Sequence, residues 1–262
     1  MLEQRVDGRW EEVAAQSPGA ELLRQFEPGR AGLPEIGDRD AAAYIEARCG
    51  DRPWLTAAQG CSPEVQRVFA ALDQGGGHAH IRHEGWVTEE MNRRRVAYLE
   101  DPAQLDLVKR GAGIDGLKPD DRAHQCRQVA ARITDPGLFA VAFARGIEYP
   151  AVRAALESSF DPDVKPRPVQ LPISELLGAD GHRYCTGWRL EPVDGSMNAA
   201  RRARKAWIAA SADHGPSDLI EPTARPVETF EHGTVVFVFG HRSDGGGYEV
   251  ITMYPRPPEQ EH

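Results

Sequence analysis

The pattern of apolar positions predicts strands near the end of the chain and helices before it. The runs 234–239 and 248–254 are rich in Val, Ile, Phe and Tyr, and a glycine-rich segment separates them, so a β-hairpin is predicted. Because side chains alternate between the two faces of a strand, Thr252 and Tyr254 are expected to share one face of the second run. Two hydroxyl groups should therefore project side by side from this strand.

Helical spacing dominates the rest of the sequence. In the segment 62–72 the apolar residues recur on one helical face, and Ser62 followed by Pro63 is a typical helix start. These apolar residues are Val65, Val68, Phe69 and Leu72. Thr88 begins a further predicted helix that carries three successive arginines. Other helices are predicted over residues 10–15, 20–26, 40–49, 102–109, 120–133, 137–145, 150–157 and 198–210, with loops and short strands over 160–195.

This order of elements indicates an α+β protein. Residues 1–70 read as short helices broken by turns, and we interpret them as a helical accessory segment that precedes a main domain at 71–262. The chain has 262 residues, of which 40% are apolar and 27% charged, which is ordinary for a globular protein with one large or two smaller domains. The main domain is expected to contain the terminal hairpin.

The charge of the chain limits how it could bind nucleic acid. A formal charge of −9 is unusual for a protein that coats nucleic acid, whereas an enzyme that binds and releases its substrate needs only a local positive patch. The predicted helix 198–210 offers such a patch, since no acidic residue lies between Asp194 and Asp213. Its candidate RNA-binding residues are Arg201, Arg202, Arg204, Lys205 and Trp207, with Trp207 available to stack on a base. A solvated surface helix is the alternative interpretation.

Neither a membrane span nor a disulfide framework is indicated. No apolar run approaches the roughly 18 residues of a membrane span, and the first residues lack the apolar core of a signal peptide. The four cysteines, Cys49, Cys61, Cys126 and Cys185, show no Cys-x-x-Cys spacing. We expect free thiols, although the even number leaves one or two disulfides open.

The strongest candidate chemistry lies between Gly75 and Arg95. Three histidines, His78, His80 and His83, follow a run of glycines, and three arginines follow at 93–95. Imidazole exchanges protons near neutral pH, and guanidinium is a planar fork that suits phosphate. The combination indicates chemistry on a phosphodiester.

Both ends of this region resemble a known family. Its pattern is a glycine-flanked His, then Arg-His, then Gly and a later Arg, and it falls here on Gly77, His78, Arg82, His83, Gly85 and Arg94. The chain closes with Thr252-Met253-Tyr254-Pro255, and the family closes with Thr-x-Tyr-Pro. These motifs resemble the RNase A-like toxin domain found at the C-terminal ends of bacterial contact-dependent inhibition and other polymorphic toxins. The segment 135–140 resembles the middle of that domain, whereas its Ser-Thr-Phe motif has no counterpart, and 158–232 is long enough to be an insertion.

The resemblance implies an RNase A-like domain with a curled antiparallel sheet and packed helices. It also implies a catalytic set of His83, Arg94, Thr252 and Tyr254, which cleaves RNA without a metal or other cofactor through attack of the 2′-hydroxyl on its own phosphate. His83 would act as base or acid, and Arg94 would stabilise the charge of the phosphorane. Tyr254 would bind a phosphate oxygen or protonate the leaving group. Thr252 would hydrogen-bond a base edge or a phosphate.

The same residues leave alternatives open. His78 or His80 could replace His83 in proton transfer, and Arg93 or Arg95 could replace Arg94 after a slip of one residue. The three histidines could instead bind zinc, although the preceding glycines argue against one helical face. A different function class is an ADP-ribosyltransferase-like toxin, with Glu249 as its candidate residue and NAD as its substrate. A non-catalytic binding or immunity protein is the third.

The resemblance also sets the expected partners. RNA, with tRNA among the candidates, is the expected substrate, and DNA is not. A toxin of this kind would be blocked by a dedicated immunity protein. It would be a secreted or delivered effector that acts in the cytoplasm of the target cell.

Overall fold

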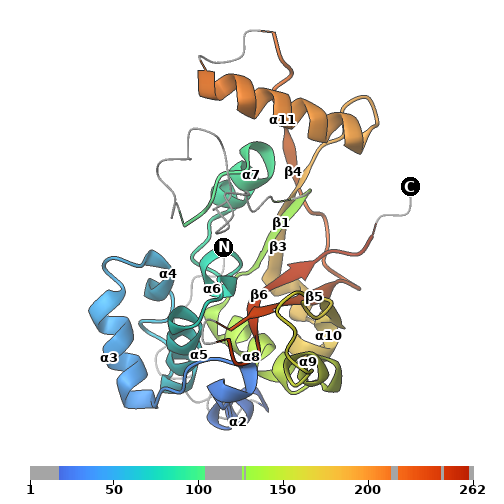
Figure 1. Cartoon of the computed structure of the whole chain (residues 1–262). Helices are drawn as coiled ribbons and strands as arrows, with labels where there is room; N and C mark the ends of the chain where they lie inside the picture. The colour runs from blue at the N-terminus through green and yellow to red at the C-terminus, as the bar shows by residue number, and fades with distance from the viewer. Residues whose placement is uncertain (1–17, 104–125, 127, 214–217, 243–244, 260–262) are drawn as a thin grey trace. The chain divides into compact units, whose positions relative to one another are not determined.

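The computed structural model describes residues 18–103, 126, 128–213, 218–242 and 245–259 (Figure 1). Contacts within the chain divide it into two units. Unit 1 consists of Met1–Gly77, Pro136–Val169 and Phe237–Thr252, and unit 2 consists of His78–Asp135, Gln170–Val236 and Met253–His262. Each unit is thus assembled from segments that are distant in sequence. The predicted division at residues 70 and 71, with an insertion at 158–232, stays a prediction.

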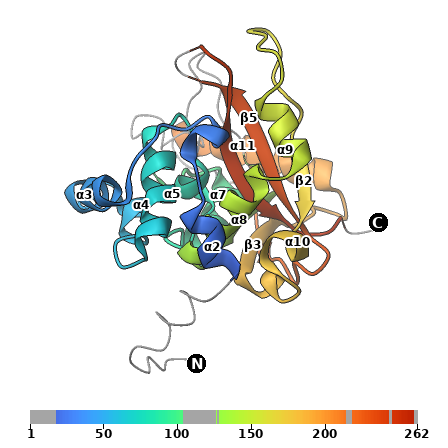
Figure 2. The same cartoon turned by 90° about the horizontal axis from the view of Figure 1, so that it is seen from below.

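Helices make up most of unit 1. They are α2 (Pro18–Arg24), the 3-10 helix η1 (Pro28–Ala31), α3 (Asp38–Arg48), α4 (Pro53–Thr56), α5 (Pro63–Gln74), α8 (Pro136–Ile147) and α9 (Pro150–Leu156). The predicted apolar face of α5 is buried, and its Phe69 ring packs 5.6 Å from the ring of Phe139 on α8. Figure 2 shows these two helices side by side. The predicted helices 20–26, 40–49, 62–72, 137–145 and 150–157 are confirmed, whereas 10–15 lies outside the described residues.

The glycine run that precedes the histidines is closely packed. The Gly76 amide donates to Oε2 of Glu249 at 3.3 Å. A Cβ atom on Gly76 would lie 2.4 Å from the other Glu249 carboxylate oxygen, and one on Gly77 would lie 2.9 Å from the carbonyl oxygen of Val250. At Gly77 the contact is with the backbone of β6, which leaves no room for a side chain, whereas the Glu249 carboxylate near Gly76 is the end of a flexible side chain and could move.

Unit 2 is built around an antiparallel sheet of order β1-β3-β4. These strands are β1 (Val129–Ile133), β3 (Cys185–Leu190) and β4 (Ala224–Pro226). The helices of this unit are α6 (Ala79–Arg82), α7 (Glu89–Tyr98), α10 (Ile173–Leu177), the 3-10 helix η3 (Gly181–Tyr184) and α11 (Met197–Asp213). The helices predicted from Thr88 onward and over 198–210 are confirmed as α7 and α11. The predicted helix 102–109 lies largely outside the described residues.

One predicted helix is wrong over its described part. Residues 129–133, which were expected to end the helix 120–133, form strand β1 and pair with β3 from Val129 opposite Arg189 to Ile133 opposite Cys185. Alanine favours a helix in isolation. Here the hydrogen bonds to β3 and the burial of Ala130, Ala131 and Ile133 outweigh that preference.

The second sheet has the order β2-β5-β6. Its strands are β2 (Val169–Pro172), β5 (Thr234–His241) and β6 (Tyr248–Arg256), and β5 and β6 each carry residues of both units. The predicted hairpin is confirmed, since β5 and β6 are neighbours and the Arg242 amide closes the turn on the Gly247 carbonyl at 3.0 Å. Together with the helices, these sheets confirm the α+β class (Figures 1 and 2).

Two further expectations concern the whole chain. All four cysteines are free thiols, with Cys126 and Cys185 buried. Within the part of the chain that the structure describes, no helix combines the length and the apolar character needed to cross a membrane.

Candidate active site

His83 is fixed to strand β1 by two hydrogen bonds. It follows the last residue of α6, its Nδ1 lies 2.8 Å from the carbonyl oxygen of Ala131, and its own carbonyl accepts from the Ile133 amide at 3.0 Å. Because a carbonyl oxygen can only accept, Nδ1 carries the proton. In the neutral ring Nε2 is then the proton acceptor.

The surroundings of His83 favour its neutral form. The side chain is buried, and this burial lowers the pKa of His83 well below its ordinary value. The positive charges of Arg95 and Arg82 lower it further, and the bond to Ala131 opposes them. A histidine of this kind is uncharged at neutral pH, so it can accept a proton at once.

Tyr254 lies against His83 within unit 2. Their ring centroids are 5.1 Å apart and the ring planes are tilted by 33°. Tyr254 lies near the end of β6 and is half-buried. His83 belongs to the motif at the beginning of the predicted domain, directly after α6. The first and last motifs, about 170 residues apart in sequence, thus meet in one place.

The predicted Arg94 is paired with a carboxylate of its own unit. Its guanidinium bonds the carboxylate of Glu100 and lies 5.5 Å from the centre of the Tyr98 ring, with 46% of the side chain exposed. Its neighbour Arg95 is buried, donates to the carbonyl of Arg82 at 3.3 Å, and is the arginine of α7 that acts on the pKa of His83. The structure therefore brings Arg95 rather than Arg94 into the electrostatic surroundings of His83.

The remaining candidate residues are Thr252, His78 and His80. Thr252 is the last residue of the part of β6 that belongs to unit 1, and its Oγ1 is buried with no hydrogen-bond partner. His78 is the N-cap residue of α6 and His80 is fully buried within it. Among the described residues, no group of three or more His, Cys, Asp or Glu side chains is placed to hold a metal ion. The three histidines are therefore not gathered into the zinc site that their spacing left open.

A buried ion pair anchors α6, and sequence reasoning missed it. Nε and Nη2 of Arg82 donate to the two carboxylate oxygens of Asp101 at 3.2 and 3.0 Å, and both side chains are almost fully buried. The indole Nε1 of Trp86 donates to the Ile81 carbonyl at 3.0 Å. These contacts hold the short helix that ends at His83.

Glu84 is a second residue that no sequence pattern indicated. The residue is fully buried, one carboxylate oxygen accepts from the Trp86 amide at 3.2 Å, and the other is buried without a hydrogen-bond partner. Burial raises the pKa of Glu84 to about 7, against the lowering by the Trp86 and Gly85 amides and by Arg132. A buried carboxyl whose pKa is raised toward neutrality is common in active sites, and this one directly follows His83 in the sequence.

Replacing Glu84 with Gln is expected to change how stability depends on pH. In the native state the carboxyl holds its proton up to pH about 7, whereas in the unfolded state it loses the proton near pH 4.5, so the wild type loses stability as the pH rises between these values. The loss amounts to about 3 kcal/mol once the pH is above 7. Urea unfolding should therefore find Glu84→Gln more stable than the wild type at pH 8. Equal differences at pH 4 and pH 8 would contradict this account.

The predicted RNA-binding helix α11 has one basic residue turned inward. Arg204 is buried and donates to the carbonyls of Val96 at 2.6 Å and Cys126 at 3.1 Å. Arg201, Arg202 and Lys205 are exposed, and Trp207 is half-buried. Arg204 thus holds the helix to its unit, and the other basic residues form the exposed face.

Comparison with protein-family models, curated proteins and solved structures finds no match. Function must therefore be argued from the residues themselves. Glu249, the candidate residue of a transferase, is buried and bonded to the Gly76 amide, so no observation favours that alternative. The pair of His83 and Tyr254 remains the best-defined candidate site.

Proposed function

We propose that the protein is a metal-independent endoribonuclease. The observation that carries the proposal is the contact of His83 with Tyr254, because it joins the two motifs that resemble the RNase A-like toxin domain. The neutral, oriented ring of His83 supports it independently of the resemblance, since such a ring suits a general base. We also propose that this protein has the curled antiparallel sheet of that family.

The proposed reaction is an internal transesterification. Nε2 of His83 takes the proton of the ribose 2′-hydroxyl, and the 2′-oxygen forms a bond to the adjacent phosphorus. The bond from phosphorus to the 5′-oxygen then breaks, and this oxygen takes up a proton. The hydroxyl of Tyr254 is the proposed donor, either of that proton or of a hydrogen bond to a non-bridging oxygen. The products are a 2′,3′-cyclic phosphate and a 5′-hydroxyl end.

The two neighbouring arginines have different proposed roles. Arg95 is buried, and its charge adds to the effect of burial in lowering the pKa of His83. Arg94 is exposed, and its pair with Glu100 is of the surface kind that contributes little stability, so a phosphate can take the place of Glu100. Arg94 would then offset charge on the phosphorane. Thr252 stays a proposed contact to substrate.

The biological setting is proposed from the resemblance alone. The protein would act as a toxin delivered into the cytoplasm of a competing cell, where RNA, with tRNA among the candidates, is its substrate. A dedicated immunity protein would cover the site of His83 and Tyr254. The exposed residues Arg201, Arg202 and Lys205 of α11 would contact RNA phosphates.

The test is incubation of the purified protein with total RNA in the presence of EDTA, followed by analysis of the new ends. We expect cleavage that leaves 2′,3′-cyclic phosphates, and none with a His83→Ala variant prepared in the same way. Absence of cleavage with and without added metal ions would overturn the proposal. Cleavage that leaves 3′-hydroxyl ends, or that persists in His83→Ala, would also do so.

A further inference from the structure

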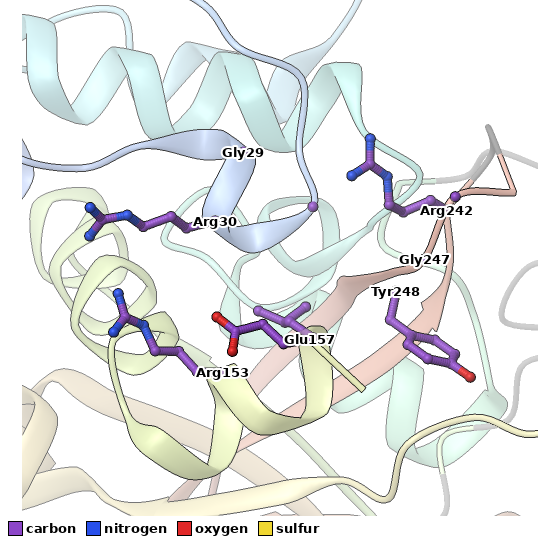
Figure 3. A pocket seen from close by; sticks show the side chains of 10 residues that line it. Gly29, Arg30, Arg153, Glu157, Arg242, Gly247 and Tyr248 are labelled. Atoms are coloured by element: carbon purple, nitrogen blue, oxygen red, sulfur yellow. The ribbon is translucent and has the colours of Figure 1, made fainter. Parts of the chain in front are cut away.

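A pocket of about 280 Å³ lies wholly within unit 1, and none of its lining residues belongs to the proposed active site. Arg30 of η1, Arg153 of α9 and Arg242 at the end of β5 contribute to its wall. In Figure 3 the side chains of Arg30 and Arg153 lie on one side of the pocket and that of Arg242 on the other, with the carboxylate of Glu157 between them. Three segments distant in sequence thus bring guanidinium groups to one opening.

Two of these arginines are oriented by shared carboxylates. Glu148 accepts from Arg30 at 3.1 Å and pairs with Arg153 at 3.0 Å, and Arg30 also pairs with Glu27 at 2.7 Å. Each guanidinium has five N–H donors, which is more than these pairs use. The pairs are exposed, so each contributes little stability. They orient the guanidinium groups, and an anionic ligand could replace the carboxylates with little loss of free energy.

The part of the wall formed by η1 is held in place by a close backbone contact with β6. Gly32 has a φ of +75°, and a Cβ atom there would lie 2.5 Å from the carbonyl oxygen of Tyr248. Only glycine combines this left-handed conformation with so close a contact. The contact keeps η1, and with it Arg30, against the hairpin that carries Arg242.

One residue of the pocket wall, Tyr248, belongs to a cluster of aromatic rings. The ring of Tyr248, a residue of the wall, lies 5.8 Å from the ring of Phe160 and 5.6 Å from that of His241. The Tyr248 hydroxyl accepts from the Asp161 amide at 2.9 Å, which holds the loop after Phe160 in place. Phe160 is 42% exposed, although large aromatic side chains are usually buried. An exposed ring on a fixed loop is a surface on which a base can stack.

We propose that this pocket binds a nucleotide, either free or as part of a single strand of RNA. The guanidinium groups of Arg30, Arg153 and Arg242 take its phosphate. The carboxylate of Glu157 accepts a hydrogen bond from a sugar hydroxyl, and the ring of Phe160 stacks on the base. Glu157 explains why a nucleotide suits the site better than a bare phosphate, because a carboxylate repels the anion and attracts the hydroxyl.

The proposal is tested by isothermal titration calorimetry. AMP, adenosine and inorganic phosphate are titrated separately into the whole 262-residue chain. AMP is expected to bind at least about tenfold more tightly than adenosine, and Arg153→Ala and Arg242→Ala should each weaken AMP binding by about tenfold. Arg183→Ala, which removes an exposed arginine of unit 2 paired with Asp180, is the matched control and should leave binding unchanged. A short single-stranded RNA in place of AMP, titrated into His83→Ala so that it is not cleaved, distinguishes a strand from a free nucleotide.

Two further variants should affect the binding of the two probes differently. Glu157→Ala should strengthen the binding of inorganic phosphate and weaken that of AMP, and Phe160→Ala should weaken AMP and leave phosphate unchanged. The proposal is overturned if neither AMP nor the RNA shows saturable binding, if adenosine binds as well as AMP, or if the arginine variants bind like the wild type. The readout is binding, and His83→Ala should bind AMP normally, so failure here is distinct from failure of the ribonuclease.

Discussion

Replacing His83 with Asn is expected to lower the rate constant of RNA cleavage by about 10²- to 10⁴-fold, the usual contribution of a general base. The Asn amide nitrogen can occupy the place of Nδ1 and donate to the carbonyl of Ala131, which the wild-type ring contacts at 2.8 Å. The variant therefore keeps the bond that fixes the residue to β1 and lacks the nitrogen that accepts the proton. Single-turnover cleavage of a defined RNA in EDTA measures the change.

The pH profile separates a base from a residue that only maintains the structure. Since burial, Arg95 and Arg82 lower the pKa of His83, the wild-type rate should fall only well below pH 6.5. Arg95→Met removes one of these positive charges, so the pKa of His83 rises and the acid limb of the profile should move to higher pH. Arg94→Met should lower the rate without moving that limb. If Arg94→Met moved the limb and Arg95→Met did not, the proposed roles of the two arginines would be reversed.

Local signals in the sequence predicted those elements whose stability is local. Ser62 and Pro63 mark the start of α5, and Thr88 caps α7 by accepting from the Met91 amide. The hairpin of β5 and β6 was predicted from β-rich runs around a glycine-rich turn. In each case neighbouring residues in the sequence supply the contacts, so a short pattern is sufficient.

Elements that depend on distant partners could not be predicted in this way. Ala130 and Ala131 belong to a strand only because β3, more than fifty residues further on, pairs with them. The spacing of the arginines could not separate Arg94 from Arg95, because consecutive helix positions point about 100° apart and the choice depends on Glu100 and on the Arg82 carbonyl. The burial of Glu84 and the meeting of Arg30, Arg153 and Arg242 are likewise non-local.

The proximity of His83 and Tyr254 was expected for a different reason. His83 was selected because its motif resembles a family in which a distant Thr-x-Tyr motif completes the site, and the ring of Tyr254 does lie beside it. Its neutral state was not predictable, since it depends on burial and on two arginines that the fold supplies. The motif was therefore enough to select His83 as a candidate, whereas its protonation state depends on packing that only the fold provides.

Asp101→Ala is expected to destabilise the protein by about 3–5 kcal/mol, the usual cost of leaving one partner of a buried ion pair unpaired. The variant leaves the charge of Arg82, whose side chain is 6% exposed, without its carboxylate, and the Ala103 amide also loses its acceptor. Urea unfolding at pH 7 measures the loss. Asp180→Ala, which breaks an exposed pair with Arg183, should cost no more than about 1 kcal/mol.

Because Arg82 precedes His83, we expect Asp101→Ala also to slow RNA cleavage at temperatures where it remains folded. The double variant Arg82→Leu with Asp101→Leu should recover much of the stability, since neither charge of this buried pair then remains. If the double variant is as unstable as Asp101→Ala, the unpaired buried charge of Arg82 is not the cause of the destabilisation. The stability of α6 then depends on the geometry of the hydrogen-bonded pair.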